Sequence, residues 1–178
     1  IGRLVAQILR GFGMHVLAYD VMPNEEWAAE YGVRYVSTTD LYRESDVISL
    51  HCPLTPENLY MINRGTISLM KDTAMIVNTG RGKLINTSDL LDALKAQKLG
   101  SAALDVYEEE TDYFFEDFSS MFVADDVLAR LLTFPNVLVT SHQAFFTHEA
   151  LSNIAATTLE NIRLFFEESE TPNLVQPG

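Results

Sequence analysis

Short runs of apolar and β-branched residues recur along the chain, and segments with helical spacing separate them. The runs lack polar alternation, which is typical of strands that are buried on both faces of a sheet. Six strands are predicted in this way: His15–Asp20, Val33–Val36, Asp46–His51, Met75–Asn78, Ser101–Tyr107 and Val137–His142. Strands and helices that alternate at this spacing predict an α/β fold, a doubly wound parallel sheet with helices on both faces.

One helix between these strands has recognisable ends. The leucines of Asp89–Leu99 share one helical face. Thr87 or Ser88 can cap its start, and Gly100 stands where a helix ends.

A longer helix is predicted from Thr147 to Glu168. Its apolar residues follow one face of a helix; they are Leu151, Ile154, Leu159, Ile162 and Phe165. This face either packs against the same domain or crosses to a neighbouring domain, and the pattern does not decide between the two. We divide the chain here, into a domain of residues 1–146 and a C-terminal helix and tail of residues 147–178.

The first twenty residues fit the second half of a dinucleotide-binding fingerprint. The whole pattern is a strand, a Gly-x-Gly-x-x-Gly turn, a helix, a second strand and an acidic residue near its end. Gly2 would be the third glycine, and the helix N-terminus beside it would hold a pyrophosphate. Asp20 stands where a carboxylate accepts hydrogen bonds from ribose hydroxyls, although it could equally be a turn residue before Pro23. No Arg or Lys follows Asp20 within Val21–Asn24, which favours NAD over NADP.

The first strand and the first two glycines of this fingerprint are absent. In a Rossmann-type sheet that strand lies in the middle, so its absence would leave two inner strands without a partner. We therefore expect the chain to be part of a longer enzyme, and to be neither stable nor active alone.

Composition narrows the classes of partner. Acidic residues outnumber basic ones by 25 to 12, for a net charge of −13, whereas nucleic-acid binders carry clustered Lys and Arg. No apolar run approaches the roughly 20 residues that span a bilayer. The single cysteine, Cys52, favours a reducing, cytoplasmic location, and no Cys/His spacing predicts a metal site. The acidic and aromatic stretch Glu108–Asp126 predicts a surface excursion after a strand.

Three strand ends carry candidate chemistry: Asn78–Gly82, Leu104–Glu110 and Thr140–Phe145. In Asn78–Gly82 two glycines flank Arg81, whose guanidinium suits bidentate capture of a carboxylate; the alternative is a surface arginine in a turn. His142 ends the last strand, and alone it is more often structural than catalytic. A carboxylate from a neighbouring strand end would make it a candidate general acid. Glu110 is the preferred partner, ahead of Glu108 and Glu109.

Four segments in register with these strand ends resemble the D-2-hydroxyacid dehydrogenase family: Asp46–Asn58, Val77–Gly82, Leu104–Glu108 and Ser141–Phe145. The similarity covers essentially all 178 residues and is nearest to the bacterial fermentative D-lactate dehydrogenases.

The resemblance implies a Rossmann-type NAD-binding domain that takes part in reducing pyruvate to D-lactate. Arg81 would bind the substrate carboxylate, His142 would exchange a proton with the substrate oxygen, and Glu110 would pair with His142. Phe145 would wall the substrate pocket, and the last helix would reach towards a substrate domain. A homo-oligomer is also implied. The implied cofactor contacts are Ile1, Gly2, Asp20, Cys52, Pro53, Asn58, Thr79, Gly80, Arg81 and Asp105.

The resemblance leaves two departures and two alternatives. Gly80 stands where the family commonly has serine, and the substrate domain is almost entirely absent. One alternative is another D-2-hydroxyacid dehydrogenase, because the motifs are shared. The other is a non-catalytic, NAD-sensing protein of the corepressor kind, against which the intact Arg81, Glu110 and His142 count.

Overall fold

The computed structural model describes residues 1–109, 125–167 and 172–174. By its internal contacts the chain divides into two units, Ile1–His142 and Gln143–Gly178. This division lies slightly before the predicted domain boundary, and the assignment of the two parts as domains stays a prediction.

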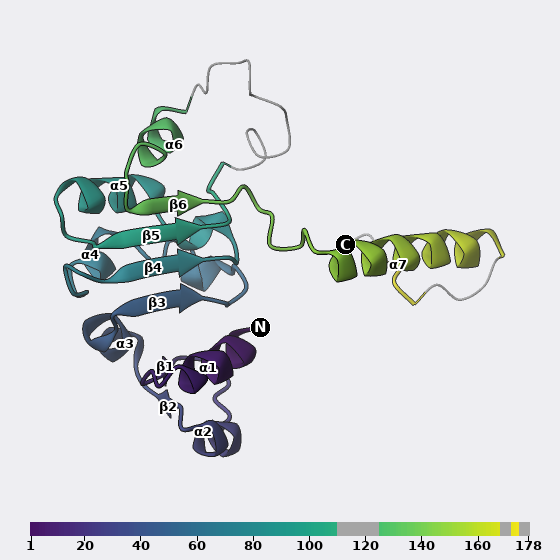
Figure 1. Ribbon diagram of the computed structural model, residues 1–178, viewed down its shortest axis with the longest axis horizontal. Coiled ribbons are helices and arrows are strands. Elements are labelled where there is room, and N and C mark those ends of the chain that lie inside the picture. Colours follow the sequence, from purple (N-terminus) through teal and green to yellow (C-terminus); the bar gives the residue numbers. More distant parts are fainter. Residues whose placement is uncertain (110–124, 168–171, 175–178) are drawn as a thin grey trace. The chain divides into compact units, whose positions relative to one another are not determined.

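The larger sheet of the first unit has four parallel strands, in the order β3-β4-β5-β6. In Figure 1 the four arrows point the same way, so their carboxyl ends share one edge. The register pairs Leu50 with Asn78, Asn78 with Leu104, and Leu104 with Val139 along this edge. The strands are β3 (Val47–Leu50), β4 (Met75–Asn78), β5 (Ser101–Leu104) and β6 (Val137–Val139).

A second, two-stranded sheet pairs β1 (Leu17–Ala18) with β2 (Arg34–Tyr35), again in parallel. Among the described residues no strand links β1 to β3. The sheet is therefore interrupted at the place where the fingerprint predicts a further strand. Each of the six strands lies within its predicted range, and the prediction of a parallel α/β fold is confirmed.

The strands β5 and β6 end earlier than predicted. Asp105–Tyr107 remain buried, although the strand pairing of β5 ends at Leu104. Beyond β6, Ser141 and His142 adopt left-handed backbone conformations, with φ of 50° and 53°. Such angles cannot continue a strand, so the chain turns at this point.

Most helices of the structure begin at a polar side chain that accepts a backbone hydrogen bond, as the sequence favours. The first helix, α1, has no capping side chain. The helices are α1 (Gly2–Gly11), α2 (Glu25–Tyr31), α3 (Thr38–Glu44), α4 (Arg64–Ile67), α5 (Thr87–Lys95), α6 (Asp126–Leu131) and α7 (His148–Phe166), with 3-10 turns η1 (Pro56–Asn58) and η2 (Gly82–Leu84).

The predicted ends of α5 are wrong at both termini. Asn86, not Thr87 or Ser88, is the cap, because its Oδ1 accepts the Asp89 N–H at 3.0 Å. The helix stops at Lys95, since Gln97 adopts a left-handed φ of 56°.

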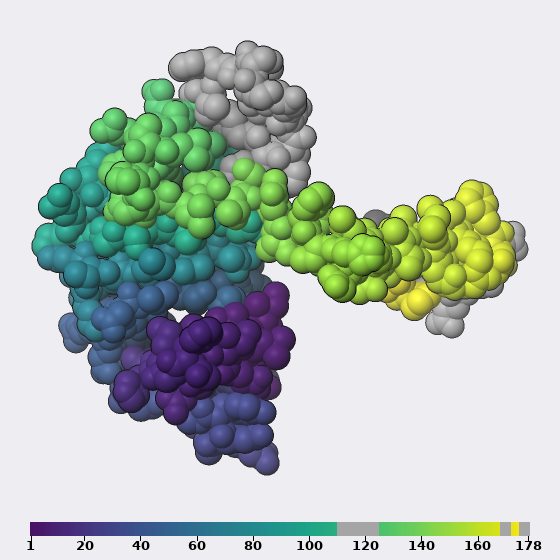
Figure 2. Space-filling view, viewed as in Figure 1, coloured from purple at the N-terminus to yellow at the C-terminus, as the bar shows by residue number. Residues whose placement is uncertain are grey.

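The main core lies between the larger sheet and a row of helices in which α3 contacts α4, α4 contacts α5, and α5 contacts α6. Its fully buried side chains include Ile62, Ile76, Leu84, Leu90 and Leu131. A separate small cluster joins α1, α2 and the two-stranded sheet through Ala6, Ala28 and Val33. Figure 2 shows α1, in purple, at the surface of this unit.

In the second unit, α7 has the predicted extent to within two residues at each end, and Thr147 Oγ1 accepts the Ala150 N–H at its start. None of its residues is buried. Both interpretations of its apolar face stay predictions. Within the described ranges, no helix has the length and apolar character that crossing a membrane requires.

Candidate active site

The carboxyl edge of the larger sheet gathers the segments that carry candidate chemistry. The His51 loop follows β3, the Arg81 turn follows β4, Asp105 follows β5 and His142 closely follows β6. Because the strands are parallel and neighbouring, these segments leave the sheet side by side (Figure 1). In parallel α/β sheets this edge is where ligands bind.

A buried asparagine holds the Arg81 turn. Asn78 is fully buried; its Oδ1 accepts the Gly80 N–H at 3.0 Å, and its Nδ2 donates to the Arg81 carbonyl at 2.9 Å. The Arg81 side chain is exposed, and its Nη1 donates to the Gly80 carbonyl. No carboxylate of residues 1–109 or 125–167 forms an ion pair with it, so the guanidinium can bind an external carboxylate.

Gly82 brings this turn against the end of β5. A Cβ atom built on Gly82 would lie 2.0 Å from the Tyr107 carbonyl oxygen and 2.6 Å from the Glu108 nitrogen. Only glycine fits, because both obstacles are backbone atoms. The close contact therefore fixes the Arg81 turn relative to the segment after β5.

Asp105 links the ends of three strands. Its N–H donates to the Asn78 carbonyl at 2.9 Å, and its own carbonyl accepts the His142 N–H at 2.5 Å. Its carboxylate, which is buried, accepts the Thr140 hydroxyl at 2.5 Å. These bonds fix the backbone of His142 relative to the Arg81 turn.

His142 is half-buried and lies in a strained segment. A left-handed φ at two successive non-glycine residues costs about 1–2 kcal/mol for each of them. Strain of this kind is concentrated at functional sites in proteins. The left-handed backbone also directs the His142 N–H towards the Asp105 carbonyl, with which it forms a short hydrogen bond.

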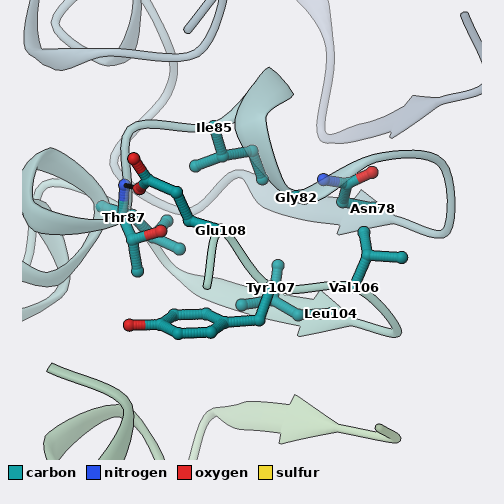
Figure 3. Close-up of a pocket in the computed structure, with 9 residues that line it drawn as sticks. Asn78, Gly82, Ile85, Thr87, Leu104, Val106, Tyr107 and Glu108 are labelled. Atoms are coloured by element: carbon teal, nitrogen blue, oxygen red, sulfur yellow. Dashed lines mark hydrogen bonds between the residues drawn. The ribbon is translucent and has the colours of Figure 1, made fainter. Parts of the chain in front are cut away.

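The Glu108 carboxylate lies on the other side of β5 from β6. Its Oε1 accepts a short hydrogen bond from the Tyr60 hydroxyl, and its Oε2 accepts the Thr87 N–H at 3.2 Å. Figure 3 shows the Glu108 side chain beside Thr87 and Ile85, at a small pocket that Asn78 also lines. Tyr60 was not predicted as a site residue, since no local sequence pattern marks it.

Tyr107 points to α6. Its hydroxyl donates to Asp125 Oδ2 at 2.5 Å, while Asp125 Oδ1 caps α6 by accepting the Val127 and Leu128 N–H groups. Burial strongly raises the pKa of Tyr107, and the hydrogen bond to Asp125 raises this pKa further. The tyrosine therefore stays protonated and acts as a structural donor.

Two predicted site residues are not joined to these groups by the structure. Glu110 lies outside the described residues. Phe145 belongs to the second unit, is 46% exposed and stacks edge-on against Phe146. Their roles as histidine partner and pocket wall stay predictions.

The start of α1 has the features of an anion site. Ile1 is its N-cap, without a capping side chain, and its first turn contains no acidic residue. Its first N–H groups therefore have no side-chain acceptor of their own, as a pyrophosphate site requires. A Cβ atom on Gly2 would lie 3.3 Å from the His51 Cβ, so helix and loop approach closely there. Burial lowers the pKa of His51, whose Nε2 lies 2.9 Å from the Ser49 hydroxyl.

Asp20 is exposed just beyond β1, and its Oδ1 accepts the Met22 N–H at 2.9 Å. It is thus a turn residue, and its exposed carboxylate can also accept ribose hydroxyls. The two interpretations of Asp20 are compatible.

The loop after β3 is folded by Asn58. Its Nδ2 donates to the Pro53 carbonyl at 2.7 Å and lies 3.8 Å from the Cys52 sulfur, while its Oδ1 accepts the Thr55 N–H. The Asn58 side chain thus serves the loop itself. Burial raises the pKa of the Cys52 thiol in the same loop. Thr79, two residues before Arg81, is exposed.

The donor set around this edge suits a dinucleotide. Helix α1 offers backbone N–H groups to a pyrophosphate and Asp20 offers a carboxylate to a ribose. Among the described residues, no three His, Cys, Asp or Glu side chains form a group that could hold a metal ion.

Comparisons with known proteins agree with this description. Residues 1–144 match the family described as D-isomer specific 2-hydroxyacid dehydrogenase, NAD binding domain. The D-lactate dehydrogenase of Escherichia coli K12 is 51% identical over 173 residues, which cover 97% of this chain and 52% of that protein.

Solved structures give the same result. D-lactate dehydrogenase with NAD+ from Lactobacillus jensenii has a TM-score of 0.86 at 33% identity, over 99% of this chain and 53% of that one. The Aquifex aeolicus D-lactate dehydrogenase, complexed with NAD and lactic acid, has a TM-score of 0.85 at 36% identity, over 98% and 54%. The chain spans about half the length of the relatives it matches.

Proposed function

Because the chain belongs to the family of D-isomer specific 2-hydroxyacid dehydrogenase NAD-binding domains, we propose that the complete protein reduces pyruvate to D-lactate with NADH. The observation that carries this proposal is the shared edge of β4, β5 and β6. There an exposed guanidinium and an imidazole are held on one backbone framework through Asp105. The relatives named D-lactate dehydrogenase, one of them with bound lactic acid, favour this substrate.

In the proposed reaction, Arg81 binds the substrate carboxylate in a bidentate pair and orients the neighbouring carbonyl. The bound NADH supplies the hydride. As negative charge grows on the carbonyl oxygen, the protonated His142 donates its proton there, and in lactate oxidation it removes that proton. Glu110 is proposed to stabilise the imidazolium. Preorganised positive charge at the developing oxyanion supplies the stabilisation that usually dominates such catalysis.

On the cofactor side, the start of α1 at Ile1 and Gly2 would hold the pyrophosphate, and Asp20 the adenosine ribose. The loop of Cys52 and Pro53, shaped by Asn58, would lie along the cofactor. Thr79, Gly80 and Asp105 would lie near the nicotinamide. A carboxylate at Asp20 repels a 2′-phosphate, so NADH is preferred to NADPH.

The experiment that tests this proposal is a rate comparison on the complete polypeptide. NADH oxidation is followed with pyruvate, hydroxypyruvate and longer 2-oxo acids, each with NADH and with NADPH, and the chirality of the product is determined. We expect pyruvate with NADH to have the highest kcat/KM and to give the D-isomer. A higher kcat/KM for another 2-oxo acid identifies a different D-2-hydroxyacid dehydrogenase, and NADH binding without turnover identifies an NAD sensor.

The role of His142 has its own test. His142→Ala is expected to lower kcat by roughly 10²–10⁴ with a smaller effect on the KM for pyruvate. His15→Ala, which removes an exposed histidine before β1, is the matched control and keeps the wild-type rate. A near-normal rate in His142→Ala contradicts the acid–base assignment. The predicted homo-oligomer and cytoplasmic location remain predictions.

A further inference from the structure

Glu108 connects three separate backbone segments of the candidate site. Its carboxylate accepts the Tyr60 hydroxyl on one oxygen and the Thr87 N–H on the other. Its own backbone nitrogen lies against Gly82, in the close approach described above. A single residue thus joins the loop after β3, the Arg81 turn and the start of α5.

Tyr60 is held in an unfavourable backbone conformation to make this contact. Its φ is 53°, in the left-handed region that a bulky residue rarely adopts. The Tyr60 N–H donates to the Lys83 carbonyl at 2.9 Å, and the Tyr60 carbonyl accepts Asn63 Nδ2 at 2.9 Å. A strained tyrosine whose hydroxyl ends on a carboxylate indicates that the side chain itself has a role there.

Tyr60 also ends the cofactor-side loop. Asn58 ties this loop to Pro53 through its side chain, and its carbonyl accepts the Met61 N–H at 3.0 Å. The loop from Pro53 to Tyr60 is therefore one hydrogen-bonded piece. Any movement of Tyr60 relative to Glu108 moves this piece relative to the Arg81 turn.

Two simpler roles for Glu108 do not account for these contacts. It is not needed as the side-chain cap of α5, because Asn86 already fills that place. It does not suit the partner role for His142, because its oxygens face segments on the β4 side of β5, whereas His142 follows β6. The choice of Glu110 for that role stays a prediction.

We propose that Glu108 and Tyr60 form a positioning pair that fixes the Pro53–Asn58 loop against the Arg81 turn and thereby sets the affinity for NADH. The proposal rests on the proposed function, in which this loop lies along the cofactor. Neither residue touches the reacting atoms. Loss of the pair loosens the loop, while Asn78 and Gly82 still hold the Arg81 turn, so NADH binding is weakened more than turnover.

The test compares Tyr60→Phe, Glu108→Gln and the double variant with the wild type, in the complete polypeptide. The dissociation constant of NADH is measured by fluorescence titration, and kcat is measured with saturating NADH and pyruvate. Tyr60→Phe is expected to raise the dissociation constant roughly threefold to thirtyfold, because a charge-assisted hydrogen bond is lost. The change in kcat is expected to be less than about threefold on the same reasoning.

The double variant identifies the pair as a unit. Glu108→Gln removes the carboxylate charge: its amide oxygen can still accept the Thr87 N–H and its amide nitrogen can donate to the Tyr60 hydroxyl oxygen, but the charge-assisted hydrogen bond is lost. Once the tyrosine hydroxyl is absent, the amide oxygen can accept the Thr87 N–H alone, so the double variant binds NADH about as well as Tyr60→Phe. The matched control is Tyr31→Phe, which removes a tyrosine hydroxyl from α2, outside the candidate site. It leaves the dissociation constant unchanged.

Thermal unfolding separates positioning from mere structural support. A residue that only supports the fold lowers the midpoint equally with and without NADH, whereas a positioning residue reduces the rise in midpoint that NADH causes. The proposal is overturned if the NADH dissociation constant of Tyr60→Phe lies within twofold of the wild-type value. It is also overturned if the fold-change of the double variant equals the product of the fold-changes of the two single variants. The titration needs no 2-oxo acid. A wild type that binds NADH without reducing pyruvate contradicts the proposed function and leaves this test intact.

Discussion

The contact of Gly82 with the end of β5 gives a substitution whose effect can be worked out from the structure. A methyl group added at this position would lie 2.0 Å from the Tyr107 carbonyl oxygen, and real contacts of a Cβ atom are essentially never below 3.0 Å. The two backbone segments must therefore separate by about 1 Å, the difference of these values. Neither can rotate away, because both colliding groups belong to the main chain.

We expect Gly82→Ala to lower the free energy of unfolding by about 3 kcal/mol or more, at the upper end of overpacking effects. In a domain of this size that corresponds to a fall in thermal midpoint of roughly 6–12 °C. The shift also displaces Arg81, which is the adjacent residue, so the KM for pyruvate should rise. Both quantities are measured on the complete polypeptide, by thermal unfolding and by steady-state kinetics.

Gly80→Ala is the control from the same turn. A Cβ atom there meets its nearest neighbours at 3.5 Å, which is ordinary van der Waals contact, and its φ is not in the left-handed region. Its stability is expected to stay within about 1 kcal/mol of wild type. The same space would admit a serine side chain at this position. A Gly82→Ala protein as stable as Gly80→Ala would refute the close contact on which the reasoning depends.

Four further predictions concern single groups of the site. Arg81→Gln should lower kcat/KM for pyruvate by roughly 10²–10³, with a lower kcat and a higher KM, as steady-state kinetics will measure. Asp20→Ser should reduce the preference for NADH over NADPH by about tenfold or more, measured as the ratio of kcat/KM values, because a repelling carboxylate is lost. Burial lowers the pKa of His51, so the unfolded chain binds a proton more readily. The contribution of His51 to the free energy of unfolding is therefore fully present above a pH of about 6.5 and is lost as the pH falls below it. His51→Gln should make the free energy of unfolding less dependent on pH, as urea unfolding at two pH values will show. Burial raises the pKa of Cys52, so iodoacetamide should alkylate it more slowly than a free cysteine thiol, as mass spectrometry of its peptide will show.

The strands could be predicted because each is a continuous apolar run, but their ends could not. Asp105–Tyr107 are as buried as the strand before them. Burial shapes the sequence pattern, whereas the hydrogen-bonded ladder defines the strand, and the two end at different residues. The pattern alone therefore extends β5 too far.

The start of α5 shows why local signals gave the wrong cap. Asn86, Thr87 and Ser88 can all cap a helix, and the choice depends on contacts from elsewhere in the chain. Thr87 is buried and gives its N–H to Glu108, which lies 21 residues away. Local sequence contains no record of that contact.

The candidate site divides in the same way. Arg81 and His142 could be predicted because each stands at the end of an apolar run and belongs to a recognisable motif. Tyr60 could not, because its importance depends on a left-handed backbone and on a carboxylate 48 residues away. The residues proposed to react have local signatures, whereas the residue proposed to position the loop beside them has only a spatial one.

The hydrogen bond from the His142 N–H to Asp105 has a mechanical consequence. His142 is the last residue of the first unit, and Gln143 begins the second. The hydrogen bond ties the last amide of the first unit to the residue that follows β5. Whatever direction the chain takes after it, the histidine backbone keeps its place beside Asp105.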